Sequence, residues 1–143
     1  MAKIYLASPF FSPEQLQLVE TAEQILRKQG HNVFSPRENQ VDGLEYGTIP
    51  WRTAVFGNDI KHVQWADYVV AIVAEGNYSD SGTAMEIGYA YGIAKPVIVI
   101  NPTKNTVNLM IADALHAYLG SWTDLLNYDF ETMPVKPYVG GVI

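Results

Sequence analysis

The feature that most constrains the fold is a series of short, continuously apolar runs separated by segments with helical character. Four such runs cover residues 4–7, 33–34, 68–74 and 96–100. Strands that are apolar on both faces are typical of a parallel sheet covered by helices, whereas half-exposed strands alternate between apolar and polar residues. Parallel neighbours need a crossover connection, so the alternation of runs and helical segments indicates βαβ units.

The first helical segment carries signals at both ends. Ser12 is a good N-cap residue, Pro13 suits the first helical position, and Gly30 closes the carboxyl end. Phe11 and Leu16 occupy the two positions of a hydrophobic staple. The sequence therefore predicts a helix from about residue 13 to residue 29.

Further helices are expected over residues 50–65, from about residue 82, and over about 107–118. We expect a fifth strand near residues 118–122 and an irregular tail from Asp124. Together these elements predict an α/β fold with a flavodoxin-like open sheet of about five mostly parallel strands and helices on both faces. The length of 143 residues suits a single domain over residues 1–143.

Composition excludes several classes of function. A net charge of −6 without a run of Lys or Arg argues against nucleic-acid binding. The chain has no cysteine, and its three histidines lack the spacing of metal ligands, so we expect neither a metal nor another cofactor. We see no signal peptide and no apolar run of the ~20 residues that span a membrane. We therefore expect a soluble cytoplasmic protein.

Two carboxylates follow the apolar run at residues 68–74, in the segment Asp80-Ser-Gly-Thr-Ala-Met-Glu86. Ligands of open α/β sheets bind at the carboxyl ends of strands, often at a helix N-terminus, so acids there are well placed for chemistry. Thr83 and Glu86 also have the spacing of a capping box, in which Glu86 would only stabilise a helix end. Both interpretations remain open from spacing alone.

Asp59 is a third candidate acid. Helical spacing places it on one face with Phe56, Ile60 and Val63, where burial would raise its pKa and make it a proton donor. The alternative is a solvated position at the rim of this face, near Lys61. An ionised carboxylate and a protonated one together are what glycosyl transfer needs.

Aromatic residues lie near the same predicted edge of the sheet. Tyr5, in the first strand, suits either a core position or the orientation of a nucleophile. Phe10 or Phe11 follow at the end of this strand and could stack on a planar base. For Phe11 we prefer the staple interpretation. The polar segment 36–49 is long for a loop of a compact domain, which is typical of a lid or an interface element.

Five segments, taken in order, resemble the nucleoside 2-deoxyribosyltransferase family, in its broad-specificity type acting on purines and pyrimidines. They are Ile4-Tyr-Leu-Ala-Ser-Pro-Phe10, Ser35-Pro-Arg-Glu-Asn-Gln40, Trp51 with Asn58-Asp59, Asp80-Ser-Gly-Thr-Ala-Met-Glu86-Ile-Gly88 and Asn108-Leu-Met110. The segment Gly82-Thr-Ala-Met-Glu-Ile-Gly88 is the most specific of the five.

The resemblance implies transfer of 2-deoxyribose between nucleobases through a covalent deoxyribosyl-glutamate. Glu86 matches the nucleophile, and Tyr5 matches the tyrosine that orients it. Asp59 and Asp80 match aspartates that bind base and sugar, with protonation of the leaving base through Asp59. Gln40 matches a base-side glutamine. The implied substrates are 2′-deoxynucleosides and free nucleobases, and ribonucleosides should be poor substrates.

The resemblance also implies a homo-oligomer, a hexamer with shared sites. Asn108 and Met110 match residues that a neighbouring subunit supplies to the 5′ side of the sugar. Family members often add a C-terminal carboxylate on an aromatic residue, whereas this sequence ends in Ile143. Aromatic residues outside the strand runs, such as Trp51 and Trp122, suit a large interface.

Two other functions remain open at this point. A nucleoside 5′-monophosphate N-glycosidase shares the fold and a similar glutamate, and Arg37 and Arg52 could bind its phosphate. A non-catalytic nucleotide-binding module is the second alternative, since a fold does not fix a function. The turn after the first strand, Ala7-Ser-Pro-Phe10, lacks the glycines of the dinucleotide fingerprint.

Overall fold

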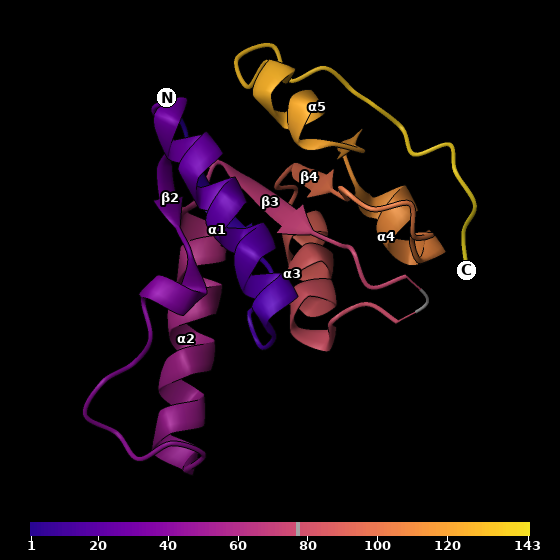
Figure 1. Ribbon diagram of the computed structural model, residues 1–143. Helices are drawn as coiled ribbons and strands as arrows, with labels where there is room; N and C mark the ends of the chain where they lie inside the picture. Colours follow the sequence, from indigo (N-terminus) through magenta and orange to yellow (C-terminus); the bar gives the residue numbers. More distant parts are fainter. Residues whose placement is uncertain (77) are drawn as a thin grey trace.

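A five-stranded sheet with strand order β2-β1-β3-β4-β5 forms the centre of the computed structural model, which describes residues 1–76 and 78–143 (Figure 1). Its strands are β1 (Lys3–Ala7), β2 (Asn32–Phe34), β3 (Tyr68–Ile72), β4 (Val97–Ile100) and β5 (Ala117–Leu119). Each neighbouring pair is parallel. The expected α/β fold with flavodoxin-type strand order is confirmed, and the pairing is parallel throughout these strands.

Alternate residues of each strand point to opposite faces of the sheet. Helices α1 (Pro13–Lys28) and α5 (Trp122–Asn127) cover one face, where Ile4 and Leu6 are buried. Helices α2 (Ile49–Trp65), α3 (Ser81–Gly92) and α4 (Leu109–Ala114) cover the other face. Tyr5 lies on this second face, and its ring stacks on that of Phe34 at 5.7 Å between centroids. A core residue is thereby directed toward α2 and α3.

Helix α1 begins as its sequence signals predict. The Ser12 hydroxyl accepts a hydrogen bond from the Gln15 amide at 3.2 Å, and the Gln15 side chain accepts one from the Phe11 amide at 2.8 Å. The carboxyl end closes at Gly30, whose φ of +91° is favourable only for glycine. Phe11 remains 75% exposed and lies against Phe10 at 4.6 Å, so packing onto α1 does not account for its position.

The carboxyl-terminal third differs from the expectation. Helix α4 is shorter than residues 107–118, because the chain leaves it at Leu115 to enter β5. The tail expected to be irregular from Asp124 contains α5, which Ser121 caps by accepting from the Asp124 amide at 3.1 Å. Burial of Leu125 in the core stabilises this short helix, a tertiary contact that local sequence does not reveal.

Two connections position the surfaces described below. After β2, a single 3₁₀ turn η1 (Pro36–Glu38) opens the long segment that leads to α2 (Figure 1). The final residues run beside the start of α4, where the Leu109 amide donates to the Ile143 carbonyl at 2.9 Å. Among the described residues, we find no helix with both the length and the apolarity needed to cross a bilayer.

Candidate active site

The amino end of α3 lies at the carboxyl edge of the sheet, and Asp80 is its N-cap. One carboxylate oxygen of Asp80 accepts from the Thr83 amide at 2.9 Å and from the Thr83 hydroxyl at 3.0 Å. The helix starts at Ser81, which places Glu86 beyond its first turn. The capping-box interpretation of Thr83 and Glu86 is therefore wrong, because Asp80 takes the capping role and leaves the Glu86 carboxylate free for other contacts.

The Glu86 carboxylate is bound by Tyr5. The Tyr5 side chain is fully buried beneath it and donates its hydroxyl hydrogen to one Glu86 oxygen. Burial, followed by the negative charges of Glu86 and Asp59, raises the pKa of the Tyr5 phenol, which therefore stays a neutral donor. Tyr5 therefore packs in the core and also contacts Glu86 through its hydroxyl.

Burial also dominates the electrostatics of Glu86. It raises the pKa of Glu86 from 4.5 to about 7, with further upward contributions from Asp59 and Asp80, while the Tyr5 hydrogen bond acts in the opposite direction. A carboxylate held partly desolvated near neutral pH is a better nucleophile than one that water solvates fully. The hydrogen bond from the Tyr5 hydroxyl fixes the orientation of the Glu86 carboxylate.

Asp59 approaches the same point from α2. Burial raises the pKa of Asp59 from 3.8 to about 6, against a smaller downward effect of His62. The direction agrees with the expectation for this residue. Its helix face is only partly apolar core, however, because Val63 is buried whereas Phe56 is 59% exposed. Asp59 lies between the two, where a carboxyl group can hold a proton and still reach a ligand.

These acids share one cavity of about 520 Å³. Of the predicted site residues, it brings together Glu86, Asp59, Asp80, Gln40 and Phe10, and Tyr5 lies directly behind Glu86. The carboxylates come from α2 and α3, whereas Phe10 and Gln40 come from the loops after β1 and β2. A cavity of this size accommodates a small polar molecule with a planar ring.

Sequence reasoning missed much of the opposite wall. Tyr46 and Trp51 line the cavity, with their rings 4.5 Å apart, although Trp51 was expected at an interface. Phe11, one of the two rings expected to stack on a base, lines the cavity beside Phe10. Asn39 and Asn58 add amide groups at the base of this wall, where the Asn58 side chain donates to the Asn39 carbonyl at 3.3 Å. The unusual length of segment 36–49 was the available signal for this wall.

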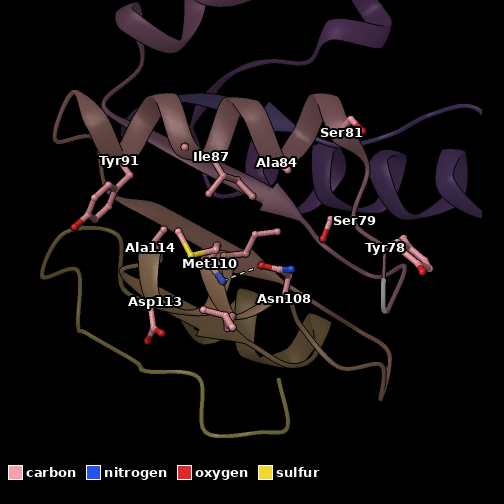
Figure 2. Close-up of a pocket in the computed structure, with 13 residues that line it drawn as sticks. Tyr78, Ser79, Ser81, Ala84, Ile87, Tyr91, Asn108, Met110, Asp113 and Ala114 are labelled. Atoms are coloured by element: carbon pink, nitrogen blue, oxygen red, sulfur yellow. Dashed lines mark hydrogen bonds between the residues drawn. The ribbon is translucent and has the colours of Figure 1, made fainter. Parts of the chain in front are cut away.

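Asn108 and Met110 are not part of this cavity. They line a second one, of about 560 Å³, between α3 and α4 (Figure 2). Asn108 caps α4 by accepting from the Met110 amide at 2.8 Å, and the Met110 side chain is 73% exposed. Within one chain, α3 separates these two residues from the Glu86 carboxylate.

The arrangement suits an exchange reaction at a glycosidic carbon. It offers a carboxylate with a fixed orientation for nucleophilic attack, a second carboxyl group whose pKa is raised to about 6, and apolar rings for a planar leaving group. Among the described residues, no group of three or more His, Asp or Glu side chains could hold a metal ion. Protein side chains supply all the groups named here.

Comparisons with known proteins identify the same chemistry. A family model for nucleoside 2-deoxyribosyltransferase matches residues 4–120. A nucleoside deoxyribosyltransferase of Limosilactobacillus fermentum is 27% identical, over 95% of this chain and 90% of the relative. One of Lactobacillus leichmannii is 26% identical, over 75% of this chain and 76% of its own. The solved structure of a 2-deoxyribosyltransferase from Bacillus psychrosaccharolyticus is 56% identical, covers 96% of this chain and 100% of its own, and superimposes with a TM-score of 0.92.

Proposed function

The chain belongs to the nucleoside 2-deoxyribosyltransferase family, and we propose that Glu86 is the nucleophile with which it transfers 2-deoxyribose between nucleobases. The observation that carries this assignment is the Glu86 carboxylate, bound by the buried Tyr5 phenol and exposed to a cavity that it shares with Asp59. A role in helix capping alone would explain neither the Tyr5 hydrogen bond nor the position of Glu86 at the cavity.

In the first half-reaction, a Glu86 oxygen attacks C1′ of a 2′-deoxynucleoside. The C1′–N bond breaks, its electron pair goes to the base nitrogen, and Asp59 donates the proton that lets the base leave neutral. The product is a deoxyribosyl ester of Glu86. An acceptor base then loses its proton to Asp59, its nitrogen attacks C1′, and the Glu86 carboxylate is released.

The remaining cavity residues bind the two parts of the substrate. Gln40 suits hydrogen bonds to the edge of the base, and Phe10 suits stacking on its face. Asp80, fixed by Thr83, suits a sugar hydroxyl. A cavity wall of aromatic rings and side-chain amides suits both purines and pyrimidines. On the sugar, a 2′-hydroxyl would destabilise the positive charge that develops at C1′. Ribonucleosides should therefore react slowly.

The single-chain site leaves the 5′ side of the sugar without a partner from the residues assigned to it. We propose a homo-oligomer, a hexamer, in which Asn108 and Met110 of a neighbouring subunit reach this side. The exposure of Leu109, Met110 and Ile143 supports it, because apolar side chains at a surface suit an interface with a neighbouring subunit. Mixing inactive Glu86→Ala and Asn108→Ala subunits should then restore activity.

We expect a single catalytic domain over residues 1–143 that takes part in nucleotide salvage in the cytoplasm. The alternative activity on nucleoside 5′-monophosphates has little support, because Arg37, one of its two candidate phosphate ligands, binds the Glu23 carboxylate at 2.5 Å. Arg52, the other candidate, is not among the residues that line the cavity of about 520 Å³, so a phosphate dianion there would lack the charge pairing that such a site needs.

A direct test mixes deoxyuridine with adenine and follows deoxyadenosine by chromatography. The wild-type protein should form it, Glu86→Ala should not, and the exposed Glu14→Ala variant should behave like wild type. Release of uracil and free deoxyribose without deoxyadenosine would indicate a hydrolase instead. A Glu86→Ala variant with more than about a tenth of the wild-type rate would contradict the assignment.

A further inference from the structure

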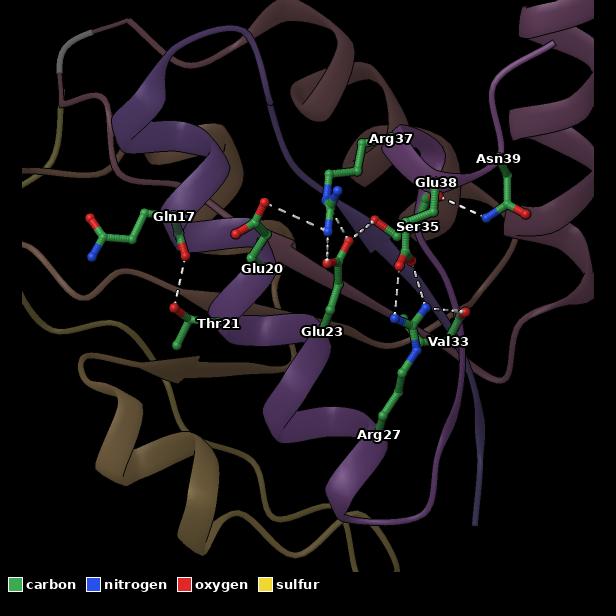
Figure 3. A network of polar contacts seen from close by, with 10 residues as sticks. All are labelled: Gln17, Glu20, Thr21, Glu23, Arg27, Val33, Ser35, Arg37, Glu38 and Asn39. Atoms are coloured by element: carbon green, nitrogen blue, oxygen red, sulfur yellow. Dashed lines mark hydrogen bonds and ion pairs between the residues drawn. The ribbon is translucent and has the colours of Figure 1, made fainter. Parts of the chain in front are cut away.

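Helix α1 carries a buried charge that the reaction does not use. Glu23 is 2% exposed, on the face of α1 that packs on the sheet. Its carboxylate accepts from the Ser35 hydroxyl at 2.6 Å and from two nitrogens of Arg37 at 3.0 and 2.5 Å (Figure 3). Burial of a carboxylate is costly unless it is paired in this way, and an apolar residue would fill the position at lower cost.

The three residues Glu23, Ser35 and Arg37, here called the Glu23 clamp, join α1 to the point where β2 ends and η1 begins. The neighbouring ion pair of Arg27 and Glu38 has side chains that are 43% and 31% exposed. Exposed pairs contribute little, because water screens them and both side chains must be ordered. The Glu23 clamp is therefore the stronger of the two attachments between α1 and this segment.

A short chain of hydrogen bonds leads from the clamp to the cavity. The Asn39 side chain donates to the Ser35 carbonyl at 2.9 Å, and the Asn39 carbonyl accepts from the Asn58 side chain at 3.3 Å. Asn39 and Asn58 both line the catalytic cavity, and each precedes a candidate site residue, Gln40 or Asp59. The clamp is thus linked through Asn39 to the part of the cavity wall that begins at Asn39 and Gln40, here called the base-side wall.

The base-side wall has few other hydrogen bonds to the rest of the described chain. Residues 40–44 form no hydrogen bond to another part of the described chain, and the next anchor is Thr48, which caps α2. Residues 42–47 are exposed. The position of Gln40 is therefore set from its amino-terminal side, by Asn39 and the residues that hold it.

We propose that Glu23 is a positioning residue for base recognition, which holds Ser35 and Arg37 so that Asn39 and Gln40 stay in place at the cavity. The proposal rests on the base-side role proposed for Gln40. Loss of the clamp should displace a binding group and leave Glu86, Tyr5 and Asp59 in place, since these come from α3, β1 and α2. It should therefore raise KM and leave kcat nearly unchanged.

The test compares Glu23→Gln, which keeps the size of the side chain, with Glu38→Gln, which removes the exposed pair. Steady-state transfer is measured for the donor nucleoside and for the acceptor base, after thermal unfolding has established that each variant is folded. We expect KM for the acceptor to rise about tenfold in Glu23→Gln, with kcat within about twofold, and no such rise in Glu38→Gln. An unchanged KM in folded Glu23→Gln would overturn the proposal.

A double-mutant cycle separates positioning from general destabilisation. In a Gln40→Ala background, Glu23→Gln should have almost no further effect on KM, because the group that it positions is gone. An equal rise in both backgrounds would overturn the proposal. Wild-type KM values in Gln40→Ala alone would instead contradict the role of Gln40 itself. If Glu23→Gln does not fold, Ser35→Ala removes one of the three hydrogen bonds, and the same cycle applies to it.

Discussion

The Tyr5 hydroxyl donates a hydrogen bond to the Glu86 carboxylate across 81 positions of the sequence. The strand alternation that buries Tyr5 also directs its phenol toward α3, so both partners of this contact, Tyr5 and Glu86, lie on regular elements rather than on loops. The pairing costs the fold some stability, because a buried carboxylate loses its hydration. The carboxylate thereby has a fixed direction and a pKa of about 7.

Replacement of Tyr5 by Phe removes the hydroxyl and keeps the ring. We expect kcat to fall by about tenfold to a hundredfold, as for other single donors at a reacting oxygen. Because the Tyr5 hydrogen bond lowers the pKa of Glu86, its loss should also shift the pH profile toward higher pH. Tyr68→Phe is the matched control, since this hydroxyl faces Phe130 on the other side of the sheet. An unshifted pH profile would contradict the pairing.

The pH dependence of kcat/KM should be a narrow bell. Glu86 must be ionised and Asp59 protonated, although the pKa of Glu86, about 7, lies above that of Asp59, about 6. The rate should therefore fall below about pH 6, where both groups are protonated, and above about pH 7, where both are ionised. The two carboxyl groups interact, so the measured values belong to the pair. Asp59→Asn should abolish the alkaline limb, and the remaining acid limb should report the pKa of Glu86 alone. A retained alkaline limb would exclude Asp59 as the acid.

Asp80 combines a structural role with a proposed binding role, and two substitutions separate them. Asparagine caps helices as well as aspartate, so Asp80→Asn should unfold at the wild-type temperature while transfer falls by at least about tenfold. Asp80→Ala should lose activity and, in addition, about 1 kcal/mol of stability. Full activity of Asp80→Asn would leave Asp80 only its capping role.

The raised pKa of Glu86 determines how the free energy of unfolding should change with pH. The pKa of Glu86 in the folded state, about 7, lies above its ordinary value of 4.5. The wild-type protein should therefore lose stability as the pH rises from about 4.5 to 7, and Glu86→Gln should lose less, because the contribution of Glu86 is gone while that of Asp59 remains. At pH 8 the variant should be more stable by on the order of 2–3 kcal/mol, a difference that shrinks toward pH 4. Denaturant unfolding at both pH values measures it, with exposed Glu14→Gln as the control.

Local patterns predicted the sheet because each buried strand is a continuous apolar run of a few adjacent residues. The same holds for the acids at the amino end of α3, which follow a strand directly. Helix α5 was missed because its stability depends on burial of Leu125 against distant residues. The burial of Glu23 and its pairing with Arg37 could not be predicted either, because a glutamate in a helix is usually solvated and nothing local in the sequence places Arg37 beside it.

Spacing alone gave the wrong weight to the capping box, because Asp80 and Thr83 are both good N-cap residues and only the start of the helix decides between them. The aromatic wall of the cavity was missed for another reason. Tyr46 and Trp51 lie in and after a long loop, whose path depends on tertiary contacts and follows no sequence period.

The central claim is that Glu86 carries the sugar between the two half-reactions. The most direct measurement incubates the protein with a 2′-deoxynucleoside and no acceptor base, quenches it with acid, and determines the mass of the intact chain and its peptides. We expect a gain of one 2-deoxyribosyl group on the peptide that contains Glu86, released by an added base and absent in Glu86→Ala. A label on another residue, or exchange of bases with no labelled chain at any time, would contradict it.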